Sequence, residues 1–323
     1  MARASDYPRV SIVILNWNRP ADTIICLHSL EKLDYPSYEI VVVDNGSTDD
    51  SVRKIGSTFP YLDILELGHN QGYAAGNNVG IRHALANGSD YFLILNNDTI
   101  VAPTMLTELV KVAESYPDAG MVGPTMYCMD SPDTVFAAGS FVDWWRGVVW
   151  HRGMFQPVGT YAQSTEPESV DFIAGCCVLV RRQVVEMAGA LDPIYHLNYE
   201  DVEWCARVQR HGFKLLYAPR AVMWHKVSAS LGKTSPCNSY YMTRNALLFF
   251  WKNSPPHIRW LPVLHVMFRA LRTVAAWSLK PSYWDRSYGL RRDAIVLGMR
   301  DFLQGRFGEM GPDVARVCYA TES

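Results

Sequence analysis

The chain has 323 residues, of which 49% are hydrophobic and 19% are charged. This length and composition exclude a disordered chain and allow one large α/β domain, alone or with an appendage. The formal net charge of −2 conceals an asymmetry, because residues 252–306 carry ten Lys and Arg against three acids, which leaves 20 basic and 29 acidic residues elsewhere.

The N-terminal part alternates short apolar runs with segments of helical spacing. Strands are predicted at residues 10–15, 39–43 and 64–67 and in the run that ends at Asn96. Helices are predicted at residues 21–32 and 51–59 and in a segment that continues to Ala86. This alternation predicts βαβ units and a mostly parallel sheet flanked by helices.

The following part is less regular. Residues 103–165 predict short strands and loops beside a site, and residues 171–180 predict another buried strand. Helices are predicted at residues 182–188 and 200–211, then a strand that contains Val222–His225, and helices beyond Ser239. Pro255-Pro256 marks a boundary, so we expect a catalytic domain at residues 1–250 and a basic helical appendage at residues 251–323.

Polar side chains follow three of the predicted strands. They lie at Asn16–Asn18, Asp44–Asn45 and Asn96–Asp98. Because open α/β sheets bind ligands at the carboxyl ends of their strands, these groups are expected to line one nucleotide site. The alternative is that each cluster only forms a turn or caps a helix.

The usual phosphate-binding loops are missing from the sequence. Neither Gly-x-Gly-x-x-Gly nor a Gly-Lys-Ser/Thr loop occurs, which argues against dinucleotide dehydrogenases and P-loop enzymes. A nucleotide diphosphate bound here needs another source of positive charge. A divalent cation on Asp98 would supply it, since such cations bind oxygen ligands and bridge to phosphates.

Four segments occur in an order that resembles a known family. They read Ser11-Ile-Val-Ile-Leu-Asn-Trp-Asn-Arg, Ile40-Val-Val-Val-Asp-Asn-Gly-Ser-Thr-Asp, Asn70-Gln-Gly-Tyr-Ala-Ala-Gly-Asn-Asn and Leu95-Asn-Asn-Asp-Thr. The set resembles the family 2 glycosyltransferases, especially their bacterial rhamnosyltransferase-like branch. The likeness extends over residues 10–245, including Gly175, Glu200-Asp201-Val-Glu-Trp, Trp224-His225 and Tyr240-Tyr241-x-x-Arg244-Asn245. It implies an inverting, metal-dependent enzyme of the Rossmann-like GT-A fold that uses nucleoside-diphosphate sugars.

The resemblance also implies a donor site. Asp44 resembles the aspartate that bonds the base, and the other donor-binding candidates are Asn16, Asn18, Asn45, Gly76, Asn77, Asn96, Asn97 and Arg244. Asp98 matches the final aspartate of the family's Asp-x-Asp signature, which binds Mn²⁺ or Mg²⁺. Asn96 replaces the first aspartate, so we expect weaker metal binding, or a bond from Asn96 to the ribose or donor sugar. For Asp44, the alternative is a turn before Gly46.

Two acids and two bases complete the candidate site. Asp201 is the expected catalytic base, with Glu200 second, because inverting transfer needs a carboxylate to take the acceptor's hydroxyl proton. Either acid alternatively caps the helix that begins there. His225 is either a ligand of metal or diphosphate, or a structural residue. Arg244 either reaches diphosphate or acceptor, or packs with Tyr240 and Tyr241.

The basic tail contains an amphipathic helix. Its apolar stripe comprises Leu261, Leu264, Phe268, Leu271 and Ala275, and His265, Arg269 and Arg272 lie on another face. The stripe fits an anionic membrane surface, but packing against the body or a second subunit explains it equally.

The most economical prediction is a transferase of cell-surface glycan synthesis. It would move L-rhamnose from dTDP-rhamnose to a hydroxyl of a glycan or polyprenyl-diphosphate-linked acceptor. The alternatives are a UDP-hexose or hexosamine donor, or a non-catalytic nucleotide-sugar-binding module. No nucleic-acid partner is expected, and a homo-oligomer remains open. Seven cysteines without Cys-x-x-Cys pairing, and the lack of an apolar export or membrane-spanning segment, predict a cytoplasmic protein, alone or at the inner face of the membrane.

Overall fold

The computed structural model describes residues 7–160, 164–226 and 235–320. The chain divides into two compact units. The first comprises Met1–Phe141, Trp150–Leu191 and Trp204–Val227, and the second comprises Val142–Val149, Asp192–Glu203 and Ser228–Ser323. The boundary expected between residues 250 and 251 stays a prediction.

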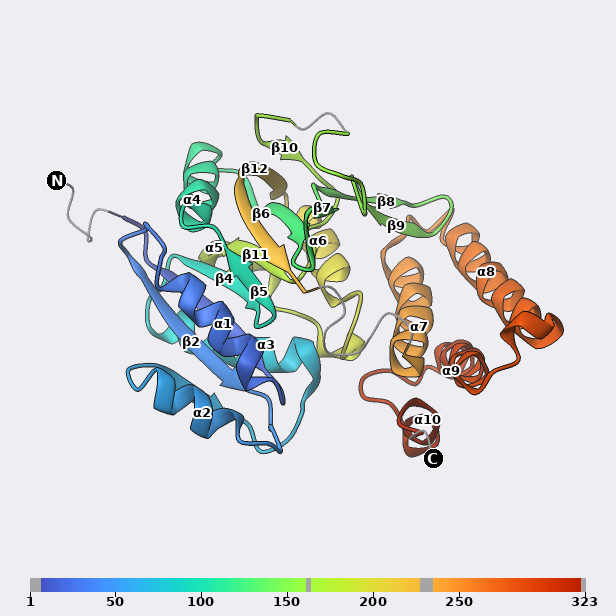
Figure 1. Cartoon of the computed structure of the whole chain (residues 1–323). Helices are drawn as coiled ribbons and strands as arrows, with labels where there is room; N and C mark the ends of the chain where they lie inside the picture. The colour runs from blue at the N-terminus through green and yellow to red at the C-terminus, as the bar shows by residue number, and fades with distance from the viewer. Residues whose placement is uncertain (1–6, 161–163, 227–234, 321–323) are drawn as a thin grey trace. The chain divides into compact units, whose positions relative to one another are not determined.

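A ten-stranded sheet organises the first unit (Figure 1). Its strands are β1 (Val10–Asn16), β2 (Tyr38–Asp44), β3 (Asp63–Glu66), β4 (Tyr91–Asn96), β5 (Thr99–Val101), β6 (Ala119–Cys128), β7 (Ser131–Ala137), β10 (Glu168–Ser169), β11 (Cys177–Arg181) and β12 (Lys214–His225). The main order is β10-β12-β6-β11-β4-β1-β2-β3, with β5 paired to β12 and β7 to β6. The strands β8 (Ser140–Asp143) and β9 (Val148–His151) form a separate pair.

The sheet is mixed, but β1, β2, β3 and β4 all run parallel. β1 pairs in parallel with both β2 and β4, and β2 pairs in parallel with β3. β11 runs antiparallel between β4 and β6, while β6 and β12 are parallel. The apolar runs of β1 and β4 are buried, as expected for strands covered on both faces.

Helices connect these strands. They are α1 (Pro20–Leu30), α2 (Ser51–Thr58), α3 (Gly72–Ala86), α4 (Met105–Ser115), α5 (Arg182–Ala188) and α6 (Glu200–Arg210). α3 lies against β1 and β2 because it carries glycine at the contact: a Cβ on Gly80 would come within 2.3 Å of Val13 and 3.1 Å of Val43. α4 packs on β6 and β12.

Two predicted strands have different bounds in the structure. The strand predicted at residues 171–180 is β11 and begins only at Cys177, because the backbone N–H groups of Asp171 and Phe172 donate to Ser140 instead of a sheet neighbour. The strand predicted after Pro219 begins earlier, at Lys214. Its register with β6 shifts between Ala218 and Val222, around a proline that lacks the N–H needed for a ladder bond.

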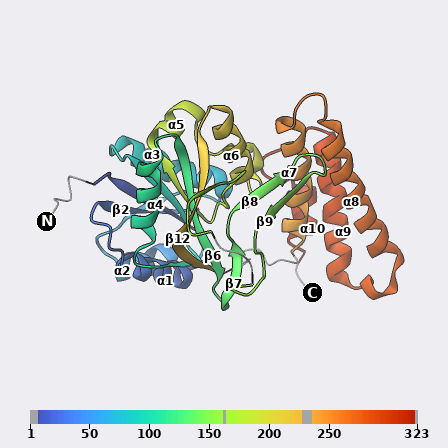
Figure 2. The same cartoon turned by 90° about the horizontal axis from the view of Figure 1, so that it is seen from above.

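The second unit is built mainly from helices (Figure 2). They are α7 (Pro236–Asn253), α8 (Trp260–Leu279), α9 (Arg286–Leu303) and α10 (Pro312–Cys318), with short 3₁₀ turns at Pro193–Tyr195 and Pro281–Tyr283. α9 contacts each of the other three helices. Its close approach to α7 depends on Gly298, where a Cβ would lie 2.9 Å from the Tyr240 carbonyl oxygen. The expected C-terminal helices are thus confirmed.

Candidate active site

The polar ends of three strands lie side by side in the first unit. Asn16 is the last residue of β1 and is in register with Asp44, the last residue of β2. On the other side of β1, Leu15 is in register with Asn96, which ends β4. The prediction that these groups share one edge of the sheet is therefore confirmed.

Asp44 is buried in a network that orders the loop after β2. Its Oδ1 accepts from Asn16 Nδ2 at 2.8 Å and from Ser47 Oγ at 2.6 Å, and its Oδ2 accepts from the Ser47 backbone N–H at 2.9 Å. Asn18 joins the same loop, since its N–H donates to Ser47 Oγ and its Oδ1 accepts from the Thr48 N–H. The turn proposed as the alternative role is present. A carboxylate has about four acceptor sites, so capacity remains for a ligand.

A row of buried hydrogen bonds runs from Asp44 towards the turn after β4. Asn97 Nδ2 donates to Thr23 Oγ1 at 2.9 Å, Thr23 Oγ1 donates to Asn16 Oδ1 at 2.7 Å, and Asn16 then donates to Asp44. Each amide is held in one orientation by this row. Thr23 is the member that the sequence did not suggest, because a threonine inside a helix has no distinctive local pattern.

Asn45 and Gly76 hold the start of α3 close to the sheet, and Asn77 lies on the same helix. Asn45 Oδ1 accepts from the Gln71 backbone N–H at 2.9 Å, and Asn45 Nδ2 donates to the Gly72 carbonyl at 3.2 Å. A Cβ on Gly76 would lie 2.6 Å from a methyl carbon of Leu15. Asn77 Nδ2 donates to the Tyr73 carbonyl, while its buried Oδ1 has no hydrogen-bond partner among the described residues. That amide oxygen is therefore a buried acceptor left unsatisfied.

Asp98 and His225 are the two candidate metal ligands. β5 pairs with the end of β12, and the two side chains meet with Asp98 Oδ1 3.3 Å from His225 Nε2. Both residues are buried, and neither Asp98 Oδ1 nor His225 Nδ1 has a hydrogen-bond partner within the described part of the chain. A buried carboxylate oxygen without a donor costs free energy unless something else binds it.

The donor set suits a hard divalent cation. Carboxylate and imidazole are accepted ligands of Mn²⁺, and such ions commonly fill the remaining positions with water and substrate phosphates. No group of three or more His, Cys, Asp or Glu side chains with metal-binding geometry occurs in residues 7–160, 164–226 and 235–320. Among the described residues, this pair would therefore supply two ligands to such an ion.

The two acids lie in the second unit, at the start of α6. Glu200 is buried, its Oε2 has no hydrogen-bond partner in the described residues, and burial together with the charge of Asp201 raises its pKa to about 8. Asp201 is less buried, and its Oδ1 accepts from the Val202 N–H at 2.8 Å. At neutral pH, Glu200 is therefore mainly protonated and neutral.

The loop before these acids is strained and is held by α7. His196, Asn198 and Tyr199 all have positive φ values, of 60°, 65° and 70°, which side chains other than glycine rarely adopt. Asn245 Nδ2 lies within hydrogen-bonding distance of three carbonyls in this segment, at 2.7 Å from Tyr195, 2.8 Å from Leu197 and 2.9 Å from Asn198. Asn245 was absent from the predicted site, although it ends the Tyr-Tyr-x-x-Arg-Asn segment.

Arg244 is fully buried beside Asn245. Its Nε donates to Asn245 Oδ1 at 3.0 Å, its Nη1 donates to the Tyr240 hydroxyl at 3.2 Å, and its guanidinium lies over the rings of Tyr240 and Tyr241. The packing role is thus present, and contact with diphosphate stays a prediction. The structure brings Glu200, Asp201 and Arg244 into the second unit, whereas the other candidates belong to the first.

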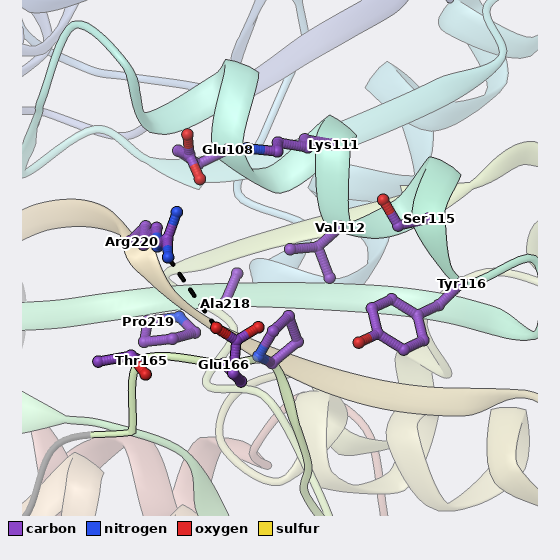
Figure 3. Close-up of a pocket in the computed structure, with 11 residues that line it drawn as sticks. Glu108, Lys111, Val112, Ser115, Tyr116, Thr165, Glu166, Ala218, Pro219 and Arg220 are labelled. Atoms are coloured by element: carbon purple, nitrogen blue, oxygen red, sulfur yellow. Dashed lines mark ion pairs between the residues drawn. The ribbon is translucent and has the colours of Figure 1, made fainter.

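A separate cavity of about 220 Å³ lies in the first unit between α4, residues 165–167 and β12 (Figure 3). Glu166 and Arg220 face each other across it at 4.0 Å. None of the predicted site residues lines this cavity, so it is not the candidate donor site.

A sequence model described as glycosyl transferase family 2 matches residues 11–188, more than half of the chain. The chain belongs to glycosyl transferase family 2. The family match includes β1, β2, α3 and β4, whose ends carry most of the candidate donor site.

Curated relatives in this family include two enzymes named for rhamnosyl transfer. The dTDP-rhamnosyl transferase RfbF of Shigella flexneri is 25% identical over 276 residues, which cover 81% of this chain and 86% of the relative. The N-acetylglucosaminyl-diphospho-decaprenol L-rhamnosyltransferase of Mycobacterium tuberculosis is 25% identical over 274 residues, covering 79% and 84%. These identities do not fix the donor of this family 2 member.

Solved structures confirm the GT-A fold. The mannosyltransferase PcManGT from Pyrobaculum calidifontis, solved with GDP-Man and Mn²⁺, has a TM-score of 0.57 and 17% identity, covering 94% of this chain and 89% of that one. At 17% identity, this similarity shows only that the two proteins share a fold.

Proposed function

We propose that this family 2 glycosyltransferase transfers L-rhamnose from dTDP-rhamnose, with inversion, to a hydroxyl of a cell-surface glycan or polyprenyl-diphosphate-linked acceptor. Two relatives are named for rhamnosyl transfer, and one of those names specifies a decaprenyl-diphosphate-linked sugar. The observation that carries the proposal is the buried row from Asn97 to Asp44 at the carboxyl ends of parallel strands.

The donor's base and ribose would bind at the edge formed by β1 and β2. Asp44 would accept a hydrogen bond from the base, because its carboxylate is fixed by Asn16 and Ser47 and retains acceptor capacity. The unpartnered Oδ1 of Asn77 offers a further acceptor on α3. Asn18, Asn45 and Gly76 would act mainly by shaping the loops around the nucleotide.

Asp98 and His225 would hold a divalent cation, Mn²⁺ or Mg²⁺, with the amide of Asn96 nearby in sequence. Their unpartnered buried atoms support this assignment. Bound there, the ion would neutralise the charge that develops on the departing nucleoside diphosphate.

Asp201 would take the proton from the acceptor hydroxyl. Asp201 is the acid of the pair assigned to this role because the raised pKa of Glu200 keeps Glu200 mainly protonated near pH 7. A neutral Glu200 carboxyl beside the base would be able to donate a hydrogen bond. Arg244 would act indirectly, through the loop that leads to Asp201.

The test is a thermal-shift panel with nucleotide sugars, each with and without Mn²⁺. We expect dTDP-rhamnose with Mn²⁺ to raise Tm most, because stabilisation follows ligand affinity. Preferential stabilisation by a UDP-hexose or UDP-hexosamine would contradict the assigned donor while leaving the family assignment intact. Release of free nucleoside diphosphate, and a product of opposite anomeric configuration, would separate an inverting transferase from a non-catalytic binding module.

A further inference from the structure

The apolar stripe of α8 is exposed in the structure. Five large side chains on it are each 41–62% exposed: Trp260, Leu261, Leu264, Phe268 and Leu271. Leu279, the last residue of α8, and Trp284 beyond the helix are also exposed. We call Trp260, Leu261, Leu264, Phe268 and Leu271 the apolar face of α8. An exposed patch of this size on one helix indicates an interaction site.

The opposite side of α8 packs within the second unit. Val263 and Val266 are buried there, and a Cβ on Gly147 would lie 2.6 Å from the Pro262 carbonyl oxygen. Arg269 donates to the backbone carbonyls of Arg146 and Gly147. Apart from Trp260, whose ring packs on Trp251 with centroids 4.6 Å apart, packing in this unit uses a different set of residues and leaves the apolar face exposed.

The charged side chains on α8 itself have one sign. α8 contains no acidic residue. Exposed His265 and Arg272 lie on the helix, and exposed Lys280 follows its end. Such a combination of apolar side chains and flanking cations is complementary to an anionic lipid surface. Trp260 and Trp284 suit the boundary between headgroups and acyl chains.

The helix is suited to lie on a bilayer, not to cross it. In the part of the chain that the structure describes, no helix has the length and hydropathy of a membrane span. Face-to-face pairing of two copies would bring these cations together without an acid on either α8. Anionic headgroups avoid that repulsion, which favours lipid over a second copy.

We propose that the apolar face of α8 docks on the surface of an anionic bilayer and holds the enzyme where lipid-linked acceptors reside. The inference about the acceptor rests on the proposed function, whereas the lipid contact rests on the exposed face alone. Leu264, Phe268 and Leu271 enter the acyl boundary, and Arg272 and Lys280 remain among the phosphates.

Vesicle flotation of the full chain tests the proposal. We expect the protein to float with vesicles of phosphatidylcholine and phosphatidylglycerol at low salt, and at least tenfold less with phosphatidylcholine alone. The triple variant L264S/F268S/L271S should lose binding at least tenfold, because it removes three exposed apolar contacts. Arg272→Glu should weaken binding to the anionic vesicles and reduce its salt dependence.

A matched control carries three serine substitutions of exposed apolar residues in the first unit, Ile25, Val158 and Met187. It should float like the unsubstituted protein. Equal flotation of the α8 triple variant and this control would overturn the proposal. So would a dimer in vesicle-free buffer that dissociates only in the α8 variant, since that outcome assigns the face to a second copy.

The donor thermal shift is measured on the same preparations without vesicles. Donor stabilisation should be the same in the α8 triple variant and the unsubstituted protein. Flotation without any donor response would leave the lipid contact standing and remove the proposed function. A donor response without flotation would leave the proposed function standing and remove the lipid contact.

Discussion

Asp98 and His225 show how the tertiary structure brings together residues distant in sequence. Antiparallel pairing of β5 with β12 sets Thr99 opposite His225, and this pairing places the neighbouring Asp98 carboxylate 3.3 Å from the imidazole. No local pattern links positions 98 and 225. The sequence predicted each residue separately as a metal ligand, and the pairing of β5 with β12 brought the two side chains together.

Asp98→Asn should lower the transfer rate by about 10²–10³-fold, since it removes the anionic ligand of a charge-stabilising site. The Asp98 carboxylate accepts no hydrogen bond through its buried Oδ1, so we expect little change in Tm. Steady-state rates across a Mn²⁺ titration measure the effect. Asp130→Asn, at an exposed turn, is the control and should behave like the unsubstituted protein.

Glu200 predicts a pH dependence of stability. Burial and the charge of Asp201 raise its pKa from 4.5 to about 8 in the folded state, so the folded chain binds more protons than the unfolded chain between these values. The free energy of unfolding should therefore fall as the pH rises from 5 to 8. Urea unfolding of Glu200→Gln should show a shallower fall and greater relative stability at pH 8. Parallel curves for the two proteins would contradict the assigned pKa.

At the scale of elements, the contact between α3 and the sheet depends on small residues. A Cβ on Gly80 would lie 2.3 Å from Val13, so Gly80→Ala should destabilise the fold by about 1–3 kcal/mol through overpacking. Gly289 of α9 is the control, because a Cβ there meets no atom within 4 Å. Gly289→Ala should stabilise by about 0.5–1 kcal/mol. Chemical denaturation of both variants measures the difference.

The Asn245 amide on α7 positions the loop that leads into α6. Asn245→Ala removes a donor shared by three carbonyls, and leaving such groups unsatisfied costs about 1–3 kcal/mol each when buried. We expect kcat to fall while the donor KM stays near its original value. Asn253→Ala, on the same helix, is the control because its Nδ2 bonds only the Phe249 carbonyl within α7. An unchanged kcat in Asn245→Ala would argue against positioning of the acids by this contact.

At the scale of the whole molecule, all seven cysteines are free and buried. Burial raises the pKa of Cys26 to about 12 and also raises that of Cys177, which keeps these thiols protonated and unreactive. A thiol-reactive chromophore should therefore label the native protein slowly and label seven groups after unfolding. If only five thiols were labelled after unfolding, the two unlabelled thiols would be assigned to Cys237 and Cys318, because their side chains share a hydrogen bond.

The local sequence pattern was sufficient to predict most of the strands around the candidate site. Buried apolar runs predicted β1, β2 and β4, and polar residues marked their ends correctly, because strand burial and chain reversal both leave a signal within a few residues. The start of β11 was wrong, since residues 171 and 172 bond to Ser140, a partner about 30 positions earlier. The cytoplasmic location and any oligomer stay predictions.

By itself, the sequence determined the family, the GT-A class and the identity of the acids and amides at the strand ends. Only the tertiary structure decided that Thr23 joins Asn97 to Asn16, that Asn245 holds the loop before Glu200, and that the apolar face of α8 is exposed. The physical reason is the same in each case. Periodicity and motifs record a residue's neighbours along the chain, whereas burial and hydrogen bonding depend on segments that meet only after folding.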